Sequence, residues 1–154
     1  MKRYTVTRFQ RWHLPLLLEQ GESEGGFFQP DSITLKYMED TPNNWTLLVE
    51  GTPLLCGGTL PQWPGRHMSW AYLNKHSGRH MCMVVRFARK AIRAPQCRID
   101  MTVRADFLAG HKFAKMLGYR VETPWMESYG PEGEPHVGYV FLPEFDKEKA
   151  KCPQ

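Results

Sequence analysis

The feature that most constrains the fold is the alternation of strand and helix patterns in the second half of the chain. "MSWAYLN" (68–74) alternates as a strand does, and a helical pattern follows it until Pro95. "CRIDMTVRA" (97–105) alternates again, and "DFLAGHKFAKMLGYR" (106–120) has its apolar residues at helical spacing. Two more strand patterns, "VETPWMESYG" and "HVGYVFLP", follow with a turn-rich connection between them. This order predicts an α/β (α+β) fold with a mixed sheet and helices on its faces.

The first half of the chain adds an antiparallel part to this sheet. "YTVTRF" predicts a first strand, and "RWHLPLLLEQGES" a helix with Pro15 in its first turn. "NWTLLVEGTPLLCGGTLP" predicts a hairpin that turns at residues 50–52, and Gly57-Gly58 indicates either a bulge or a close backbone approach. "EGGFFQPD" and "QWPGRH" are predicted loops. "SITLKYMED" fits either a short helix or an extended segment.

Length and composition limit the class of protein. The 154 residues, 42% of them hydrophobic, fit one globular domain, which we place at residues 1–145 before a charged tail at 146–154. No apolar run approaches the roughly 20 residues that span a membrane, so we expect no membrane partner and an intracellular location. The four cysteines lack CxxC spacing and are expected to be reduced thiols.

The start of the helix after residue 74 is the first candidate for a binding site. In "YLNKHSGRHMCMVVRF" a strand pattern ends, a polar turn with one glycine follows, and a helix begins. Ser77 is the expected N-cap of this helix. A helix N-terminus carries free N–H donors and a partial positive charge, so this turn is suited to a phosphate group. An ordinary strand-to-helix turn without a ligand has the same sequence pattern.

Two other groupings point to less specific chemistry. His76 and His80 are four residues apart with Cys82 nearby, but His76 precedes the expected N-cap and no second ligand pair completes a tetrahedron, so no metal site is predicted. Basic residues with few acids among them also run through the first helix of this half and the strand after it. They favour a solvated helix face over a specific nucleic-acid ligand, since no recognised motif accompanies them. They are Arg79, Arg86, Arg89, Lys90, Arg93, Arg98 and Arg104.

The element order and one motif resemble the GNAT (GCN5-related N-acetyltransferase) superfamily. "AGHKFAKMLGYRVE" (109–122) is similar to that family's late helix, of the type A-x-x-F-Y-x-K-x-G-F, with Phe113, Leu117, Gly118 and Tyr119 matching. The likeness covers about residues 45–142. Within the superfamily, "RIDMTVRADFLAGHKFAKMLGY" (98–119) and "ESYGPEGEPHVGYVF" (127–141) are similar to GNAT-like proteins encoded by tailed bacteriophages. The resemblance therefore implies a GNAT-like, mostly antiparallel sheet and a phage origin.

The resemblance also implies where a ligand lies. In GNAT enzymes acetyl-CoA occupies the cleft between the splayed fourth and fifth strands, and its pyrophosphate binds the start of the next helix in a [QR]-x-x-G-x-[GA] motif. "KHSGRH" stands at that place, with Gly78 matching and His80 in place of the small last residue, where its side chain is expected to crowd the phosphates. The implied cofactor-binding residues are Leu73, at the end of the preceding strand, and Lys75, His76, Ser77, Gly78, Arg79 and His80 in the turn.

The catalytic groups are harder to name from the sequence. The tyrosine that often serves the family as general acid aligns with Ala114, which has no proton to give. No general base is assigned, and Glu50, His67, Asp100 and Glu127 are candidates by position only. We therefore expect a GNAT-like phage protein with weak or absent acetyl-CoA-dependent N-acyltransferase activity. The alternative is a non-catalytic structural protein of a tailed-phage virion. Its partners would be other virion proteins or further copies of itself, and its location the host cytoplasm and then the virion.

Overall fold

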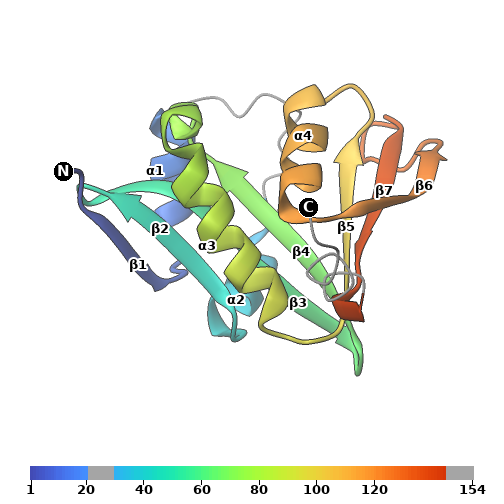
Figure 1. Cartoon of the computed structure of the whole chain (residues 1–154), viewed down its shortest axis with the longest axis horizontal. Coiled ribbons are helices and arrows are strands. Elements are labelled where there is room, and N and C mark those ends of the chain that lie inside the picture. The colour runs from blue at the N-terminus through green and yellow to red at the C-terminus, as the bar shows by residue number, and fades with distance from the viewer. Residues whose placement is uncertain (21–29, 145–154) are drawn as a thin grey trace, which may run out of the picture.

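The computed structural model describes residues 1–20 and 30–144 and contains one seven-stranded sheet (Figure 1). The strand order is β1-β2-β3-β4-β5-β7-β6, and every neighbouring pair is antiparallel except β4 and β5, which are parallel. The predicted mixed, mostly antiparallel sheet is therefore confirmed. The strands are β1 (Tyr4–Arg8), β2 (Asn44–Val49), β3 (Thr52–Trp63), β4 (Arg66–Leu73), β5 (Arg98–Arg104), β6 (Arg120–Met126) and β7 (His136–Phe141).

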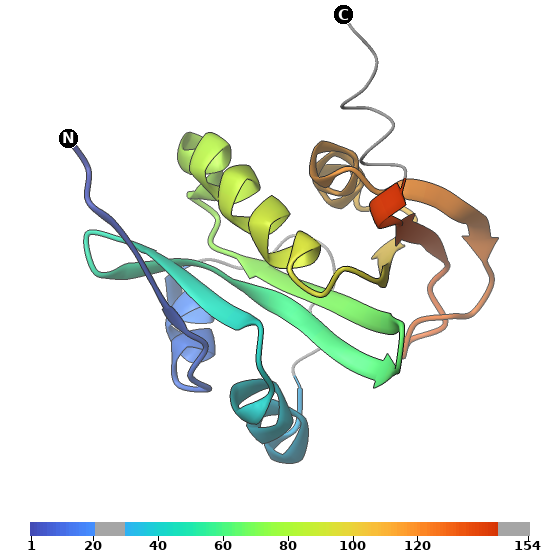
Figure 2. The same cartoon turned by 60° about the horizontal axis from the view of Figure 1, so that its bottom comes forward.

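Helices cover both faces of the sheet. Figure 2 shows α1 and α2 against one face and α3 and α4 against the other. The single parallel pair, β4 and β5, is connected through α3, as a crossover between parallel strands requires. The helical elements are α1 (His13–Gln20), α2 (Ser32–Asp40), the short 3₁₀ helix η1 (Ser77–His80), α3 (Met81–Arg93) and α4 (Leu108–Leu117).

The two faces of the sheet bury separate apolar clusters. Successive side chains of a strand point to opposite faces, and β4 follows this rule as predicted. Trp70 and Tyr72 pack with α1 and α2, whereas Ser69 and Ala71 face α3. The larger cluster lies under α3 and α4 and includes Leu55, Val84, Ile99, Phe113 and Tyr139. The smaller one, under α1 and α2, includes Phe9, Leu14, Leu17, Met38 and Cys56.

The β2–β3 hairpin forms where the sequence predicts it. Its turn has positive φ angles of 49° at Glu50 and 80° at Gly51. Of the two interpretations of Gly57-Gly58, the close backbone approach is correct. A Cβ atom on Gly58 would lie 2.1 Å from the carbonyl oxygen of Asn43, and one on Gly57 would lie 2.9 Å from that of Trp70. The register shift of this hairpin lies elsewhere, between Leu47 and Leu48 in β2.

Two segments differ from the expectation or settle an open choice. "QWPGRH" is not a loop: β3 runs to Trp63 and β4 resumes at Arg66, so only two residues turn, with Gly65 at φ 90°. The Arg66 guanidinium lies 4.4 Å from the centroid of the Trp63 ring, which favours this tight pairing. "SITLKYMED" is the helix α2, because the Asp31 carboxylate accepts from the Thr34 N–H at 2.7 Å and caps it.

Of the two predicted caps of α4, the one at the N-terminus is wrong and the one at the C-terminus is confirmed. Asp106 does not cap the helix with its side chain; it accepts from Arg104 Nε at 2.5 Å, and Phe107 occupies the N-cap position. Gly118 ends the helix in the left-handed conformation at φ 96°, as expected of a glycine just after a helix. Pro95 lies just past the end of α3, also as predicted.

Three further predictions concern single residues and short segments. Cys56, Cys82 and Cys97 are free thiols, and burial raises the pKa of Cys56 to about 12. Cys152 and the charged tail lie outside the described residues, as does most of the predicted "EGGFFQPD" loop. Among the helices described, none is both long and apolar enough to cross a bilayer.

Candidate functional site

The sheet opens between its two parallel strands. β4 and β5 pair only where Arg66, His67 and Met68 meet Arg98, Ile99 and Asp100. Beyond these three pairs β4 continues to Leu73 and β5 to Arg104 without pairing to each other, and Figure 1 shows the two strands diverging. The result is a V-shaped gap in the sheet, which we call the splay, with its apex at Met68 and Asp100.

The apex of the splay is closed by side chains. Ser69 Oγ donates to the carbonyl oxygen of Asp100 at 3.3 Å, which gives that carbonyl a partner where the strand ladder stops. The hydroxyl of Tyr119, just before β6, donates to Ser69 Oγ at 2.7 Å. Burial raises the pKa of Tyr119 above its usual value, so the phenol keeps its proton at neutral pH. A protonated phenol therefore stands at the apex.

Little free space remains beneath the helices at this point. The cavity between the splay and α3 and α4 has a volume of about 30 Å³. A cavity of this volume has room for only about one or two water molecules. Its lining combines small residues of β4 with large ones of β5 and α4, including Ser69, Ala71, Met101, Phe113 and Tyr119. Any group that enters the apex from the open end must displace some of these side chains.

The open end of the splay holds the turn that precedes α3. Asn74 organises it: its N–H donates to the Leu54 carbonyl at 2.9 Å, and its Oδ1 accepts from the His76 N–H at 2.8 Å. The Ser77 N–H donates to the Asn74 carbonyl at 2.9 Å. The prediction that Ser77 caps the helix is therefore wrong. Asn74 bonds the turn, η1 begins at Ser77, and α3 starts at Met81 without a side-chain cap.

His80 turns away from this surface. Its Nδ1 lies 2.7 Å from the Tyr4 hydroxyl, and the two rings meet edge to face at a centroid distance of 5.6 Å. The residue is only 8% exposed. Gly78, in contrast, has open space where a Cβ would stand. The ring of His80 is thus held against β1, whereas Lys75, His76 and Arg79 are exposed around Gly78.

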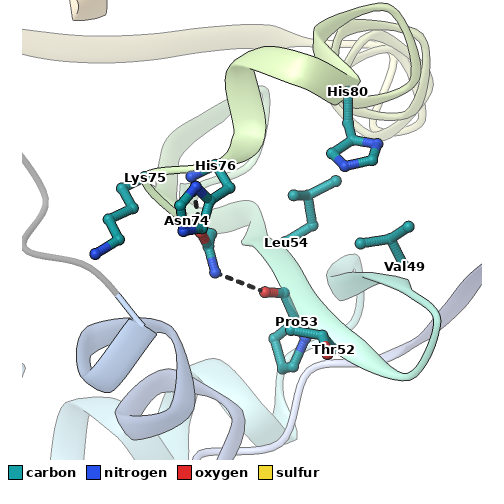
Figure 3. Close-up of a pocket in the computed structure, with 8 residues that line it drawn as sticks. All are labelled: Val49, Thr52, Pro53, Leu54, Asn74, Lys75, His76 and His80. Atoms are coloured by element: carbon teal, nitrogen blue, oxygen red, sulfur yellow. Dashed lines mark hydrogen bonds between the residues drawn. The ribbon is translucent and has the colours of Figure 1, made fainter.

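A pocket of about 280 Å³ lies on the β3 side of the same turn. In Figure 3 His80 lies beside Leu54 and Val49, and Asn74 reaches toward Pro53, whose carbonyl accepts from Asn74 Nδ2 at 3.4 Å. None of the lining residues comes from β5, so this pocket is separate from the splay. It is lined by Val49, Thr52, Pro53, Leu54, Asn74, Lys75, His76 and His80.

The residues expected to bind a cofactor are contiguous, and the fold keeps them together. Leu73 ends β4, Lys75 and His76 form the turn, and Ser77–His80 form η1. They therefore surround the open end of the splay. His76 and His80 do not combine with Cys82, because among residues 1–20 and 30–144 no three His, Cys, Asp or Glu side chains gather closely enough for a metal ion.

The candidates for a general base are not brought together. Glu50 is exposed in the β2–β3 turn, where its Oε1 accepts from the Arg3 N–H at 2.7 Å. His67 lies in the paired part of β4 with Nδ1 3.2 Å from Thr59 Oγ1, and burial lowers its pKa. Glu127 follows β6 and accepts from Trp125 Nε1 at 2.7 Å. These three side chains belong to three different parts of the sheet.

Asp100 lies at the apex but is engaged in ion pairs. Its carboxylate accepts from Arg66 Nε, and from Arg98 Nε at 2.8 Å. Arg98 in turn binds the carboxylate of Glu122, with Nη1 3.0 Å from Oε1. These carboxylates raise the pKa of Arg98, Glu122 having the larger effect and Asp100 the next. Asp100 therefore connects β4 to β5 where their pairing ends.

Sequence reasoning missed the residues that shape the apex. Ala114, aligned with the family's acid, is fully buried on α4 and does not line the cavity. Tyr119, which matches the aromatic residue at the end of the motif, brings its hydroxyl to Ser69. This position of Tyr119 at the apex follows only from its hydrogen bond to Ser69, which is 50 residues away in the sequence. The sequence signal for Asn74 was available, because an asparagine two residues before a backbone donor is typical of an Asx turn.

Comparison with known proteins supplies the name of the fold. No family model matches the chain, and no curated protein matches it in sequence. Solved structures do match. Ard1 from Thermoplasma volcanium superposes with a TM-score of 0.73 at 11% identity, covering 90% of this chain and 97% of that one. The chain has the GNAT fold.

Two further GNAT-fold structures agree. A GNAT-family acetyltransferase from Streptococcus pneumoniae matches with a TM-score of 0.65 at 15% identity, over 91% of this chain and 99% of that one. A chain of the NatC complex bound to Gag peptide and CoA matches with a TM-score of 0.65 at 10% identity, over 90% and 98% respectively. At these identities the likeness concerns the fold, so ligand and activity must be argued from the site.

Proposed function

We propose that this protein binds acetyl-CoA at the splay and is an N-acyltransferase of the GNAT type with low turnover. The observation that carries the proposal is the early end of the β4–β5 ladder. Only three residue pairs form, and the turn before α3 stands at the open end of the gap that results. A gap in a sheet leaves backbone donors and acceptors without strand partners, which suits an extended, amide-containing ligand.

The turn fits the pyrophosphate of such a ligand. Gly78 leaves space for phosphate oxygens, and Lys75 and Arg79 are exposed beside it. The start of a helix adds backbone donors and a partial positive charge. The expected obstacle, the ring of His80, is bound to Tyr4 instead. This contact supports the proposal, because the space around Gly78 stays open.

The apex has one group suited to proton transfer. Bound acetyl-CoA would supply an acetyl thioester, whose transfer to an amine releases a thiolate that needs a proton. Ala114 cannot provide one, whereas the buried Tyr119 phenol holds a proton beside Ser69. We assign Tyr119 as the proton donor. Turnover is expected to be slow because the phenol lies in a nearly filled cavity and must leave its bond to Ser69.

Calorimetry with acetyl-CoA tests the binding step. The native protein should release heat at submillimolar ligand. Gly78→Glu should weaken binding at least about tenfold because it places a negative charge beside the pyrophosphate. Gly78→Gln is the matched control, since it has the same size without the charge, and it should weaken binding less than Gly78→Glu does. If the native protein gives no heat at millimolar acetyl-CoA, the proposal is wrong. Unchanged affinity in both variants would place the phosphates elsewhere.

A second candidate function is a non-catalytic role in a tailed-phage virion. The filled apex and the buried Ala114 favour it, because a scaffold needs neither an open acyl site nor a proton donor. The phage origin rests on the resemblance of residues 98–141. Its partners would be other virion proteins or further copies of this chain, in the host cytoplasm and then in the particle. Mass spectrometry of purified particles tests this role, and absence of the chain from them would reject it.

A further inference from the structure

The outer surface of α3 and α4 carries positive charge without any negative charge. Neither helix contains an Asp or Glu, and no acidic residue occurs anywhere from Gly51 to Ile99. Both helices lie on the same face of the sheet (Figure 2). We define the basic face as the five exposed cations of these helices, Arg86, Arg89, Lys90, Lys112 and Lys115.

The two helices that carry these charges are in contact with each other. Arg89 Nε on α3 donates to the carbonyl oxygen of Met116 on α4 at 2.9 Å, so the helices touch near their C-terminal ends. Arg86 and Lys90 are one turn apart on α3, and Lys112 and Lys115 are neighbours on α4. Within the described residues no carboxylate forms an ion pair with any of the five side chains. Their charges are therefore available to a partner.

Helix stability does not account for this arrangement. Arg86 and Lys90 are like charges four residues apart, a spacing that destabilises a helix rather than supporting it. A favourable interaction with the helix dipole is confined to the last turn. Lys90 lies in the last turn of α3 and Lys115 in that of α4, whereas Arg86 and Lys112 lie outside the last turns. Solubility alone is served equally well by mixed charges, which α2 has in Lys36, Glu39 and Asp40.

The acetyl-CoA site proposed above does not use this surface. Its phosphates would meet the turn at Gly78, before α3 begins at Met81. Lys90 is nine residues further along the helix than Met81, about 14 Å at 1.5 Å per residue. The basic face thus extends along the helices, away from the turn. A partner that meets all five cations must itself carry negative charge at regular intervals over such a length.

We propose that the basic face binds the phosphodiester backbone of a nucleic acid, without sequence preference. A nucleic acid is an extended polyanion with regularly spaced phosphates, and Lys and Arg contacts to it release condensed counterions. The exposed side chains belong to two rigid helices, so they can contact successive phosphates without a recognition motif. Binding should depend strongly on salt concentration and little on base sequence.

The test is a titration of a fluorescent DNA duplex of about 20 base pairs at several salt concentrations. Between three and five phosphate contacts predict a slope of log K against log salt of about −2.7 to −4.5, at roughly −0.9 per contact. Arg86→Glu/Lys90→Glu should reduce the steepness of that slope by about two, and weaken binding at about 50 mM salt at least tenfold. A single strand of the same length should bind with a shallower slope, at roughly −0.7 per contact.

The control variant is Arg8→Glu/Lys36→Glu. Both residues are exposed, one on β1 and the other on α2, away from α3 and α4. Each double variant lowers the net charge of +4 by four, to zero, so general charge effects are matched. The control should bind the duplex like the native protein. Both double variants replace exposed residues, and circular dichroism checks that they are folded.

Four results would overturn the proposal. The first is no binding of the native protein at about 50 mM salt, and the second is equal loss in the two double variants. The third is displacement of the duplex by millimolar CoA at constant ionic strength, because the basic face would then belong to the CoA site. The fourth is tighter binding to vesicles of phosphatidylserine and phosphatidylcholine than to the duplex, because the partner would then be an anionic membrane surface.

Discussion

Single residues shape the apex and the turn of the candidate site. His80 shows how a residue that breaks a family motif can be accommodated, because its hydrogen bond to Tyr4 directs the ring away from the turn. Ala114 shows the opposite case, because a fully buried alanine on α4 leaves the usual acid position without a proton. Tyr119 lines the cavity with a phenol, which carries a proton at neutral pH.

Replacing Tyr119 by Phe tests its role as proton donor. The variant should release free thiol from acetyl-CoA, in the presence of peptide amines, at least about 100-fold more slowly, since general acids contribute on the order of 10²–10⁴. The affinity for acetyl-CoA in calorimetry should stay unchanged. The lost hydrogen bond to Ser69 should lower the free energy of unfolding by about 1 kcal/mol.

Ser69→Ala is the control for this substitution. It removes the same hydrogen bond, together with the one from Ser69 to the Asp100 carbonyl, so it should destabilise the fold at least as much, but it leaves the phenol in place. Its rate of thiol release should therefore stay within about tenfold of the native rate. If Tyr119→Phe and Ser69→Ala slow release equally, the phenol acts only through the structure of the apex.

At the level of elements, sequence patterns located most helices and strands because their physical causes are local. The alternation of β4 and β5, the apolar spacing of α3 and the glycine after α4 each reflect neighbours in the chain. The sequence missed contacts between distant segments. Trp63 pairs with Arg66, so the segment expected to be a loop is mostly strand. The Asp106 carboxylate, which was expected to cap α4, accepts from Arg104 instead.

The same distinction applies to the candidate site. The β4–α3 turn was found from its own residues, because a glycine-containing turn between a strand and a helix is a local signal. The apex was not found, because Ser69 and Tyr119 are 50 residues apart and only the fold brings them together. The general-base candidates were chosen one at a time, and the structure places Glu50 and His67 in different parts of the sheet.

The tight pairing of β2 and β3 can be tested with a single methyl group. Gly58→Ala should lower the free energy of unfolding by about 3 kcal/mol, because its Cβ would meet the Asn43 backbone at 2.1 Å and the strands must separate. Gly78→Ala is the control, since open space surrounds that position, and it should change stability by less than about 0.5 kcal/mol. Urea unfolding measures both. Equal midpoints would mean that the strands adapt easily at Gly58.

The whole molecule consists of two antiparallel halves of a sheet that meet at one short parallel joint. β1–β4 form one half and β5–β7 the other, and three residue pairs connect them. Asp100 reinforces this joint, because it binds Arg66 of β4 and Arg98 of its own strand, and Arg98 continues to Glu122 of β6. The separation that opens the candidate site therefore starts at a point fixed by ion pairs.

Replacing Asp100 by Asn should weaken the joint and the whole fold with it. Asp100 is 7% exposed, and loss of its charge leaves two arginines without their buried partner, at a cost of about 3 kcal/mol of unfolding free energy. Glu122→Gln is the control, because that carboxylate is exposed and its loss should cost less than about 1 kcal/mol. Hydrogen exchange should accelerate first at Met68 and Asp100, on either side of the joint, and later in β2 and β3. Uniform acceleration throughout the sheet would show that Asp100 supports the fold generally and does not hold the two halves together at this joint.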